Sequence, residues 1–312
     1  MKRDFLSLVD FSAAEWPAVF ARAAELKAAR RDPQRAAASR RELAGKAVAL
    51  VFEKASTRTR VSFEVGLKEL GADVVVMQAG DSQLGRGEPP EDTARVLSRY
   101  VHAIMLRTFG DDRLRKFARA ASVPVLNGLS DMAHPLQVAT DLFTILERRG
   151  AAGDPGALRG LAIAFVGDGT SNMALSWIEA AELFEIEFRL ACPKTYTPPE
   201  SVLERAAKYV TCTDDPSAAV AGVAVVNTDV WTSMGMEGEA DARRRAFRGF
   251  SVDEALLAGA SPAAFVLHCL PAHRGEEISA GVLEGPRSAV WDQAENRLHV
   301  QKAIVLQLMK GH

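Results

Sequence analysis

The sequence predicts an α/β protein with two doubly wound parallel-sheet domains. Short runs of β-branched and apolar residues alternate with segments of helical length along nearly all of the 312 residues. This alternation is typical of parallel strands joined by crossover helices. The length also favours two domains, at roughly 100 to 200 residues each. Residues 150–156 are rich in glycine and proline, so we expect the two halves to divide near them.

Nine short apolar runs are the expected strands. They lie at residues 47–52, 74–77, 103–107, 123–126, 161–166, 187–191, 223–227, 265–268 and 289–291. After the first run, Phe63, Leu67 and Leu70 have the spacing of one helix face. Gly71 follows at the position where a glycine commonly ends a helix.

Two longer helices are expected to join the domains and close the fold. A helix over residues 135–149 bridges the two halves, and residues 293–309 form one terminal helix. We assign residues 1–138 to a first domain, on which the terminal segment 293–312 packs back, and residues 139–292 to a second.

The composition is that of a soluble globular protein, with 48% hydrophobic and 25% charged residues. A net charge of -2 provides no field that would attract nucleic acid or a membrane, so the expected partners are small molecules. The three cysteines lack the spacing of a disulfide framework or zinc site. The N-terminus lacks the apolar core of a signal peptide. These features predict a cytoplasmic protein.

The strongest local signal is Ser56-Thr57-Arg58-Thr59-Arg60, where an expected strand gives way to a helix. Backbone N–H groups of a first helical turn converge on one point and bind anions. Ser56 and Thr57 add hydroxyl donors, and Arg58 has a planar fork that suits phosphate oxygens. By itself, the pentapeptide fits equally well a helix cap followed by two solvated arginines.

Further polar residues stand at other strand ends, where open α/β sheets bind ligands. Arg107 closes a strand, and His134 and Gln137 stand at the mouth of the bridging helix, which we expect to lie outside the core. A lone histidine is more often structural than functional, but His134 is expected to lie beside two arginines, Arg58 and Arg107. The set predicts a pocket for a phosphate joined to a carbonyl. Thr59, Arg107 and His134 polarise the carbonyl oxygen, and Arg58 holds the phosphoryl group.

The second half contains a partial dinucleotide fingerprint. Gly167 and Gly169 match its first two glycines, but Asn172 takes the place of the third. No acidic residue ends the next expected strand to bind a ribose hydroxyl, which disfavours a nicotinamide cofactor. An exposed Asn172 side chain suits a substrate carboxylate or ammonium instead.

Two later strand ends also carry polar groups. Asp229 can pair with an α-ammonium, while Ser233 and the Met234 amide can bind an α-carboxylate. An ordinary surface turn is the alternative. Cys269 follows His268 at the end of another strand and could act as a thiolate nucleophile. We favour a non-nucleophilic role, because no His–Asp pairing is recognisable at fixed spacing.

Eight ordered blocks carry a resemblance to a known family. They are Ser-Thr-Arg-Thr-Arg (56–60), Asp-Ser-Gln-Leu-Gly-Arg-Gly (81–87), Asp-Thr-Ala-Arg-Val-Leu (92–97), His-x-x-Gln (134–137), Gly-Asp-Gly-x-x-Asn-Met (167–173), Asp-x-Trp-x-Ser-Met-Gly (229–235), His-Cys-Leu-Pro (268–271) and Asp-Gln-Ala-Glu-Asn-Arg (292–297). In these blocks the chain resembles the aspartate/ornithine transcarbamoylase family, from Phe5 to the terminal helix. The Ser-Met-Gly loop and the His-Cys-Leu-Pro turn indicate the ornithine branch.

The resemblance implies transfer of the carbamoyl group of carbamoyl phosphate to the δ-amine of L-ornithine, in arginine biosynthesis. It implies that carbamoyl phosphate is bound by Ser56, Thr57, Arg58, Thr59, Gln83, Arg107, His134, Gln137, Cys269, Leu270 and Arg297, and ornithine by Asn172, Asp229, Ser233 and Met234. Of these, Arg58, Arg107, His134 and Cys269 are the expected catalytic residues. Gln83 would come from a neighbouring subunit, since the family's sites lie between the subunits of a homotrimer.

The implied reaction is a direct attack of the amine on the carbonyl carbon, with no covalent enzyme intermediate, cofactor or metal. Leu136 and Met132 depart from the family's usual residues beside the carbamoyl pocket, and bear on its rate or affinity. Two alternative functions are left open by the sequence. The first is a transcarbamoylase for putrescine or N-acylornithine, and the second is a non-catalytic phosphate-binding homologue. The Asp229 and Ser233 pair argues against the first, and joint retention of the phosphate-binding residues argues against the second.

Overall fold

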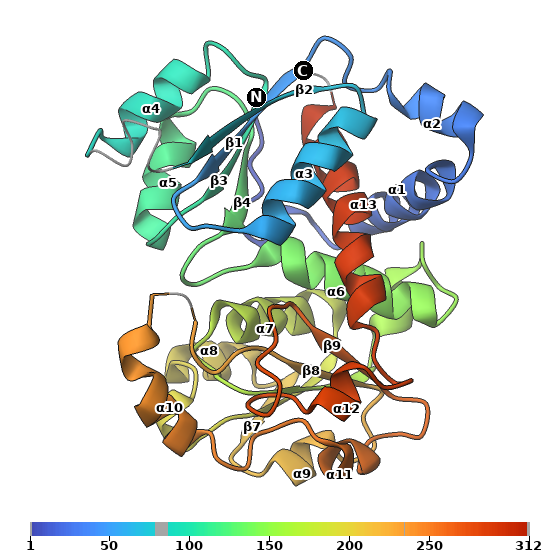
Figure 1. The fold of residues 1–312 in the computed structure, drawn as a ribbon, viewed down its shortest axis with the longest axis vertical. Coiled ribbons are helices and arrows are strands. Elements are labelled where there is room, and N and C mark those ends of the chain that lie inside the picture. Colours follow the sequence, from blue (N-terminus) through green and yellow to red (C-terminus); the bar gives the residue numbers. More distant parts are fainter. Residues whose placement is uncertain (1, 79–86, 234, 311–312) are drawn as a thin grey trace. The chain divides into compact units, whose positions relative to one another are not determined.

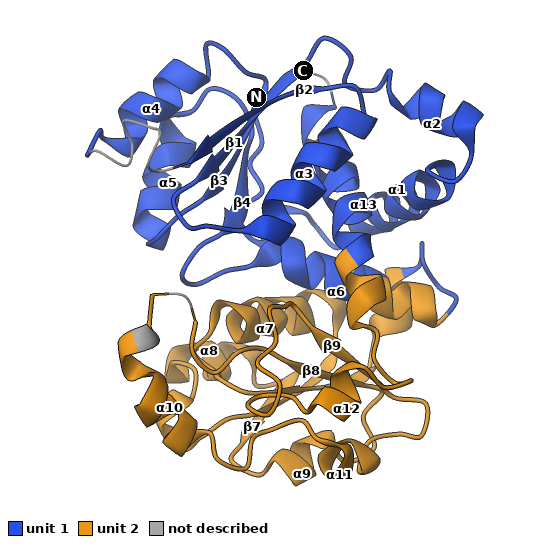
Figure 2. Ribbon diagram, in the orientation of Figure 1, with its two compact units in different colours: residues 1–143, 150–154, 295–312 blue, residues 144–149, 155–294 orange. Residues whose placement is uncertain are grey.

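The structure is a computed structural model that describes residues 2–78, 87–233 and 235–310. The chain divides into two compact units (Figure 2). Unit 1 comprises residues 1–143, 150–154 and 295–312, and unit 2 comprises residues 144–149 and 155–294. Each unit is a parallel sheet with helices, so the predicted fold class is confirmed. None of the described helices is both long and apolar enough to cross a membrane.

Unit 1 is built on a four-stranded parallel sheet of order β2-β1-β3-β4. Its strands are β1 (Ala47–Phe52), β2 (Asp73–Gln78), β3 (Ala103–Arg107) and β4 (Val125–Leu129). Its helices are η1 (Leu8–Asp10), α1 (Trp16–Ala29), α2 (Pro33–Ser39), α3 (Thr57–Glu69), α4 (Pro90–Leu97), α5 (Asp111–Ala120) and the first part of α6 (Pro135–Arg148). Helices α4 and α5 cover one face of the sheet, and α1 and α3 lie on the other (Figure 1).

Two local predictions for unit 1 are confirmed. Ser56 caps α3, since its hydroxyl oxygen accepts a hydrogen bond from the Thr59 backbone N–H at 3.3 Å. Gly71 follows the end of α3 with a φ of +88°. A side chain there would strain the backbone and meet the Arg40 carbonyl oxygen at 1.9 Å, so only glycine suits the position.

Unit 2 is built on a five-stranded parallel sheet of order β7-β6-β5-β8-β9. Its strands are β5 (Ala162–Val166), β6 (Glu187–Ala191), β7 (Val210–Thr213), β8 (Val225–Thr228) and β9 (Phe265–His268). Its helices are η4 (Pro155–Leu158), α7 (Asn172–Phe184), η5 (Lys194–Tyr196), α8 (Glu200–Ala206), α9 (Pro216–Val220), η6 (Glu237–Glu239), α10 (Ala240–Ala246), α11 (Glu254–Ala258) and α12 (Ala280–Leu283).

The strand order of unit 2 reverses between β5 and β8, which are hydrogen-bonded neighbours. Open α/β sheets bind ligands at the carboxyl ends of such strands. On one face of the sheet, Trp177 of α7 stacks on Phe188 of β6 with ring centroids 5.8 Å apart. On the other face, α9 to α12 share one apolar core with the strands.

The terminal helix α13 (Val290–Met309) returns to unit 1 as predicted. Its Gln301 side chain accepts a hydrogen bond from Ser62 of α3 at 2.8 Å. Its Lys302 side chain forms an ion pair with Glu69 at 2.8 Å. These contacts lie within unit 1 and fix α13 against α3.

Strand predictions differ from the structure at several places. The strand expected at 289–291 is wrong, because α13 begins at Val290 and Trp291 is 52% exposed on its first turn. Such a short apolar run does not distinguish a strand from a helix. The edge strand β7 was missed, because its Val-Thr-Cys-Thr sequence is mostly polar. Strand β4 starts at Val125, after Pro124, rather than at residue 123.

Candidate active site

The first cluster of predicted residues lies in unit 1, where strands end and helices begin. Phe52, the last residue of β1, pairs in register with Arg107, the last residue of β3. Ser56 caps α3 directly after β1, and His134 immediately precedes α6. The described residues of unit 1 therefore place the predicted phosphate-binding groups at one edge of the sheet.

The start of α3 is a capped helix that also keeps donors suited to an anion. The Ser56 oxygen accepts from Thr59, while its O–H remains a donor. Thr57 is exposed and Arg58 is half-buried, so both side chains are accessible to a ligand. The two interpretations of this segment are thus compatible, because capping uses the Ser56 oxygen and anion binding uses donors.

A buried network joins α3, α6 and α13. Arg297 of α13 donates through Nη2 to Thr59 Oγ1 at 2.7 Å and through Nη1 to Gln137 Oε1. The Gln137 amide nitrogen in turn donates to Asp141 Oδ1 at 2.8 Å. Arg297 therefore orients the Thr59 hydroxyl, and the Asp141 carboxylate accepts the next hydrogen bond of the network, from Gln137.

The expectation that His134 and Gln137 lie outside the core is wrong. His134 is 4% exposed and Gln137 is completely buried. The reason is the return of α13, whose Arg297 covers Gln137 from a distant part of the sequence. The residues at the start of α6, which would be exposed in an isolated helix, thus become part of a buried polar cluster.

His134 is surrounded by positive charge. Burial, followed by the charges of Arg297, Arg107 and Arg58, holds the pKa of His134 well below its usual value. The ring is therefore neutral at physiological pH and acts as a polar hydrogen-bonding group rather than as a cation. Three arginines around a neutral imidazole match a ligand with a multiply charged phosphate and an uncharged carbonyl.

Sequence reasoning missed Lys54, which lies two residues before the cap of α3. Its side chain is buried, pairs with Asp131 and lies with Nζ 4.2 Å from the centre of the Phe109 ring. Asp131 also accepts from the Gly110 backbone N–H at 2.7 Å. Lys54 thereby ties the segment after β1 to the loops after β3 and β4.

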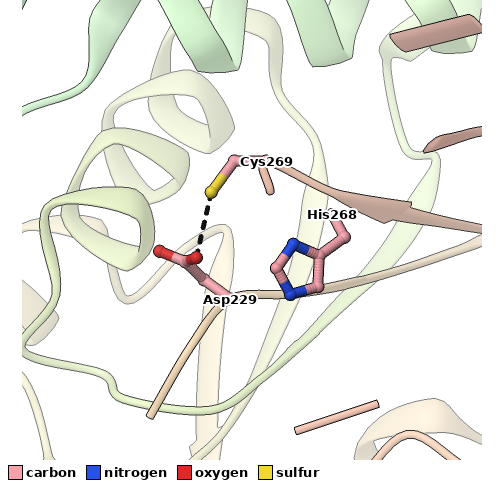
Figure 3. Close-up of side chains that lie close together, drawn as sticks. All are labelled: Asp229, His268 and Cys269. Atoms are coloured by element: carbon pink, nitrogen blue, oxygen red, sulfur yellow. Dashed lines mark hydrogen bonds between the residues drawn. The ribbon is translucent and has the colours of Figure 1, made fainter. Parts of the chain in front are cut away.

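The second cluster lies in unit 2 and contains Asp229 and Cys269 (Figure 3). The Cys269 thiol donates to Asp229 Oδ1 at 2.9 Å, and the Val230 backbone N–H donates to the same oxygen at 2.8 Å. Burial raises the pKa of Asp229, which is 8% exposed. A cationic group at this carboxylate would offset the cost of its burial.

His268 holds the turn that carries Cys269 and Leu270. Its Nδ1 accepts from the Leu270 backbone N–H at 2.8 Å, so the ring proton must be on Nε2, which donates to Glu277 Oε1 at 3.1 Å. Leu270 has a φ of +60° and precedes a cis peptide bond to Pro271. The sequence blocks included His268, but the Glu277 partner was missed.

Asp229, His268 and Cys269 have candidate metal-ligand atoms within 4.8 Å of one another. A borderline metal such as zinc accepts this donor set. Both ring nitrogens of His268 already make hydrogen bonds, however, so coordination there would break one of them. The arrangement therefore favours a structural role for His268.

The remaining predicted residues of unit 2 lie in the segments that follow β5 and β8. Asn172 is the first residue of α7 and is half-buried, and Ser171 caps this helix by accepting from Ala174 N at 3.2 Å. Ser233 is also half-buried. Met234 lies outside the described residues, as does Gln83 of the predicted unit 1 site.

Arg243 of α10 was also missed, although it joins these two loops. Its Nη1 forms a buried ion pair with Asp168 Oδ2 at 2.6 Å and donates to the Trp231 carbonyl at 2.9 Å. Asp168 belongs to the loop after β5, and Trp231 to the loop after β8. Nearby, a side chain on Gly169 would meet the Tyr196 carbonyl at 2.7 Å, so this glycine is explained by close packing.

Comparison with known proteins identifies the family. Residues 3–147 match the carbamoyl-P binding domain of aspartate/ornithine carbamoyltransferase, and residues 159–308 match its Asp/Orn binding domain. The chain belongs to the aspartate/ornithine carbamoyltransferase family. The resemblance inferred from the sequence blocks is confirmed, and the chain is a carbamoyltransferase.

Members of this family align with the chain over nearly its whole length. Ornithine carbamoyltransferase of Geobacter sulfurreducens is 52% identical, covering 99% of this chain and 100% of the relative. Ornithine carbamoyltransferase of Sorangium cellulosum is 55% identical, and the alignment covers 99% of this chain and 98% of the relative. The solved ornithine carbamoyltransferase of Pyrococcus furiosus is 42% identical, with a TM-score of 0.90, and covers 100% of this chain and 98% of its own. The anabolic enzyme of Campylobacter jejuni is 38% identical, with a TM-score of 0.89 and full coverage of both chains.

Proposed function

We propose that this carbamoyltransferase transfers the carbamoyl group of carbamoyl phosphate to the δ-amine of L-ornithine, giving citrulline and phosphate in arginine biosynthesis. The observation that carries the proposal is the neutral, buried His134 among Arg58, Arg107 and Arg297 in unit 1. The relatives named above are all ornithine carbamoyltransferases, which supports ornithine as the acceptor.

Carbamoyl phosphate meets complementary groups in the unit 1 cluster. The first-turn amides of α3 and the Arg58 guanidinium bind the phosphoryl oxygens. Arg107, His134 and the Thr59 hydroxyl, oriented by Arg297, donate to the carbonyl oxygen as negative charge develops on it. These donors stabilise the tetrahedral intermediate and the departing phosphate, while the substrates supply the nucleophile and the leaving group.

Ornithine is assigned to the loops of unit 2. The Asp229 carboxylate, with its raised pKa, pairs with the α-ammonium, while Ser233 and the Met234 amide hold the α-carboxylate. Asn172 at the start of α7 contributes a further polar contact. The Cys269 thiol donates to Asp229 and orients that carboxylate, so it needs no covalent role.

The test of the acceptor is phosphate release from carbamoyl phosphate, measured separately with L-ornithine, putrescine and N-acetylornithine, which would give citrulline, N-carbamoylputrescine and N-acetylcitrulline. We expect ornithine to be preferred by a wide margin, because each buried polar group left without its partner costs about 1–3 kcal/mol. A higher kcat/KM for putrescine or for N-acetylornithine would refute the assignment of ornithine.

The anion site is tested with a matched pair of variants on α3. Arg58→Ala should raise the KM for carbamoyl phosphate and lower kcat. The reason is that the Arg58 guanidinium binds the phosphate and stabilises the negative charge on the phosphate as it leaves. Arg60→Ala is the control, since Arg60 is exposed and its guanidinium lies 3.8 Å from the carboxylate of Glu64 on the same helix. Equal kinetics for the two variants would contradict the assignment.

We further infer a cytoplasmic homotrimer with active sites shared between subunits. Mixing inactive Arg107→Ala protein with an inactive Gln83→Ala protein, under conditions of subunit exchange, should then restore activity. A fully active monomer at assay concentration would refute the shared site. The biosynthetic role is tested in an arginine auxotroph that lacks its own carbamoyltransferase. Expression of this chain should restore its growth without added arginine.

A further inference from the structure

Two of the three cysteines lie together at one end of the unit 2 sheet. Strands β6 and β7 are parallel neighbours, with Leu190 opposite Cys212 in register. Cys192 lies two residues after Leu190, so its side chain is on the same sheet face as that of Cys212. Their sulfur atoms are 3.6 Å apart. Cys269 lies after β9, the opposite edge strand of the same sheet.

The two thiols have different environments. Cys192 is 2% exposed, whereas Cys212, on the edge strand, is partly exposed. The hydrogen bond between them raises the pKa of Cys192, with burial as the next cause, and lowers the pKa of Cys212. Cys212 is therefore the sulfur with more thiolate character and better access, and Cys192 is a protonated partner behind it.

We propose that Cys192 and Cys212 form a redox-modification site that a peroxide converts to a disulfide. The Cys212 thiolate attacks one peroxide oxygen, the O–O bond breaks, and the product is a sulfenic acid and water after protonation. The Cys192 sulfur then attacks the Cys212 sulfur, the S–O bond breaks, and a second water leaves. The two thiols lose two electrons and two protons in total, and the peroxide is reduced to water.

Disulfide formation would displace the loop that follows β5. The sulfur atoms must approach by about 1.5 Å to reach a bond length of about 2.05 Å. Cys192 Sγ packs against Gly169, where an added Cβ would be 3.0 Å from the sulfur. Gly169 lies three residues before Asn172, so movement of Cys192 changes the support of the loop that leads to Asn172. This part of the inference rests on the proposed function, in which Asn172 contacts ornithine.

The direct test needs no activity measurement. The reduced protein is treated with one equivalent of hydrogen peroxide, blocked with N-ethylmaleimide, digested and analysed by mass spectrometry. We expect loss of two of the three thiols, a peptide linked through Cys192 and Cys212, and full reversal by dithiothreitol. Cys269 is the internal reference, because its thiol should stay reduced and be alkylated by N-ethylmaleimide. Preferential oxidation of Cys269, or a Cys212 sulfinate without the linked peptide, would overturn the proposal.

Variants and kinetics complete the test. In Cys212→Ser protein, Cys192 should remain a free thiol at the same peroxide dose, because the more reactive sulfur is gone. Oxidised wild-type protein should show a several-fold higher KM for ornithine, with the KM for carbamoyl phosphate unchanged. An unchanged KM for ornithine in fully linked protein would overturn the coupling to the Gly169 loop. Failure of the reduced protein to form citrulline would instead count against the proposed function, and the linked peptide would stand.

Discussion

Replacement of Arg243 should destabilise unit 2, because this side chain joins two loops through buried contacts. Its ion pair with Asp168 has both side chains 6% exposed, and its second bond goes to the Trp231 carbonyl. Arg243→Met would leave the Asp168 carboxylate buried without its counter-charge. Breaking a buried pair in this way costs about 3–5 kcal/mol.

The structure places the expected loss near the lower end of that range. The other oxygen of Asp168 keeps two hydrogen bonds, from Thr170 N at 2.8 Å and Thr170 Oγ1 at 2.7 Å. The contact of Arg243 with Glu239 adds little, because Glu239 is 62% exposed. A loss of about 3 kcal/mol corresponds to a decrease in Tm of roughly 6–12 °C for a domain of this size.

The assay is thermal unfolding followed by tryptophan fluorescence, since unit 2 holds three of the four tryptophans. Glu239→Gln is the matched control, with an expected change below about 1 kcal/mol. The double variant Arg243→Met/Asp168→Asn should be less destabilised than the sum of its single variants, by about 2 kcal/mol. Additive single effects, or a wild-type Tm for Arg243→Met, would refute the buried-pair argument.

Three further outcomes are expected. Thr59→Val removes the acceptor of the Arg297 bond and should raise the KM for carbamoyl phosphate about tenfold, whereas Ser62→Ala on the same helix should not; equal effects would contradict this. Burial, then the charge of Lys302, lowers the pKa of His299 to about 3, so protons favour the unfolded chain. Stability should fall as pH drops from about 6.5 towards 3, by up to about 1.4 kcal/mol per pH unit; a His299→Gln variant with a parallel stability curve would contradict the assignment. The δ-amine of ornithine has a pKa of about 10.4, so the rate at low ornithine should climb up to about tenfold per pH unit between about pH 6 and 8. A flat profile would show that amine deprotonation is not limiting.

Local order was predictable because it depends on residues close in sequence. The alternation of apolar runs and helical segments indicated two parallel sheets, and the spacing of Phe63, Leu67 and Leu70 with Gly71 gave the end of α3. The same local patterns failed where a short run carried little information. The apolar start of α13 was taken for a strand, and the polar edge strand β7 was missed.

The candidate site was predictable in its residue types but not in its connections. The motif at the start of α3 has a recognisable chemistry, and the sequence blocks indicated the family. The sequence did not show that Arg297 would bond to Thr59, 238 residues away, or that its return would bury His134 and Gln137.

What the sequence by itself determined was therefore the class of fold, the local helix starts and ends, and the family to which its motifs belong. Only the tertiary structure decided which distant groups meet, as in the Arg243–Asp168 ion pair and the Cys192–Cys212 contact. The physical reason is that periodicity and capping act within a few residues. Long-range pairs depend instead on strand order and helix packing, which bring side chains together irrespective of their separation in sequence.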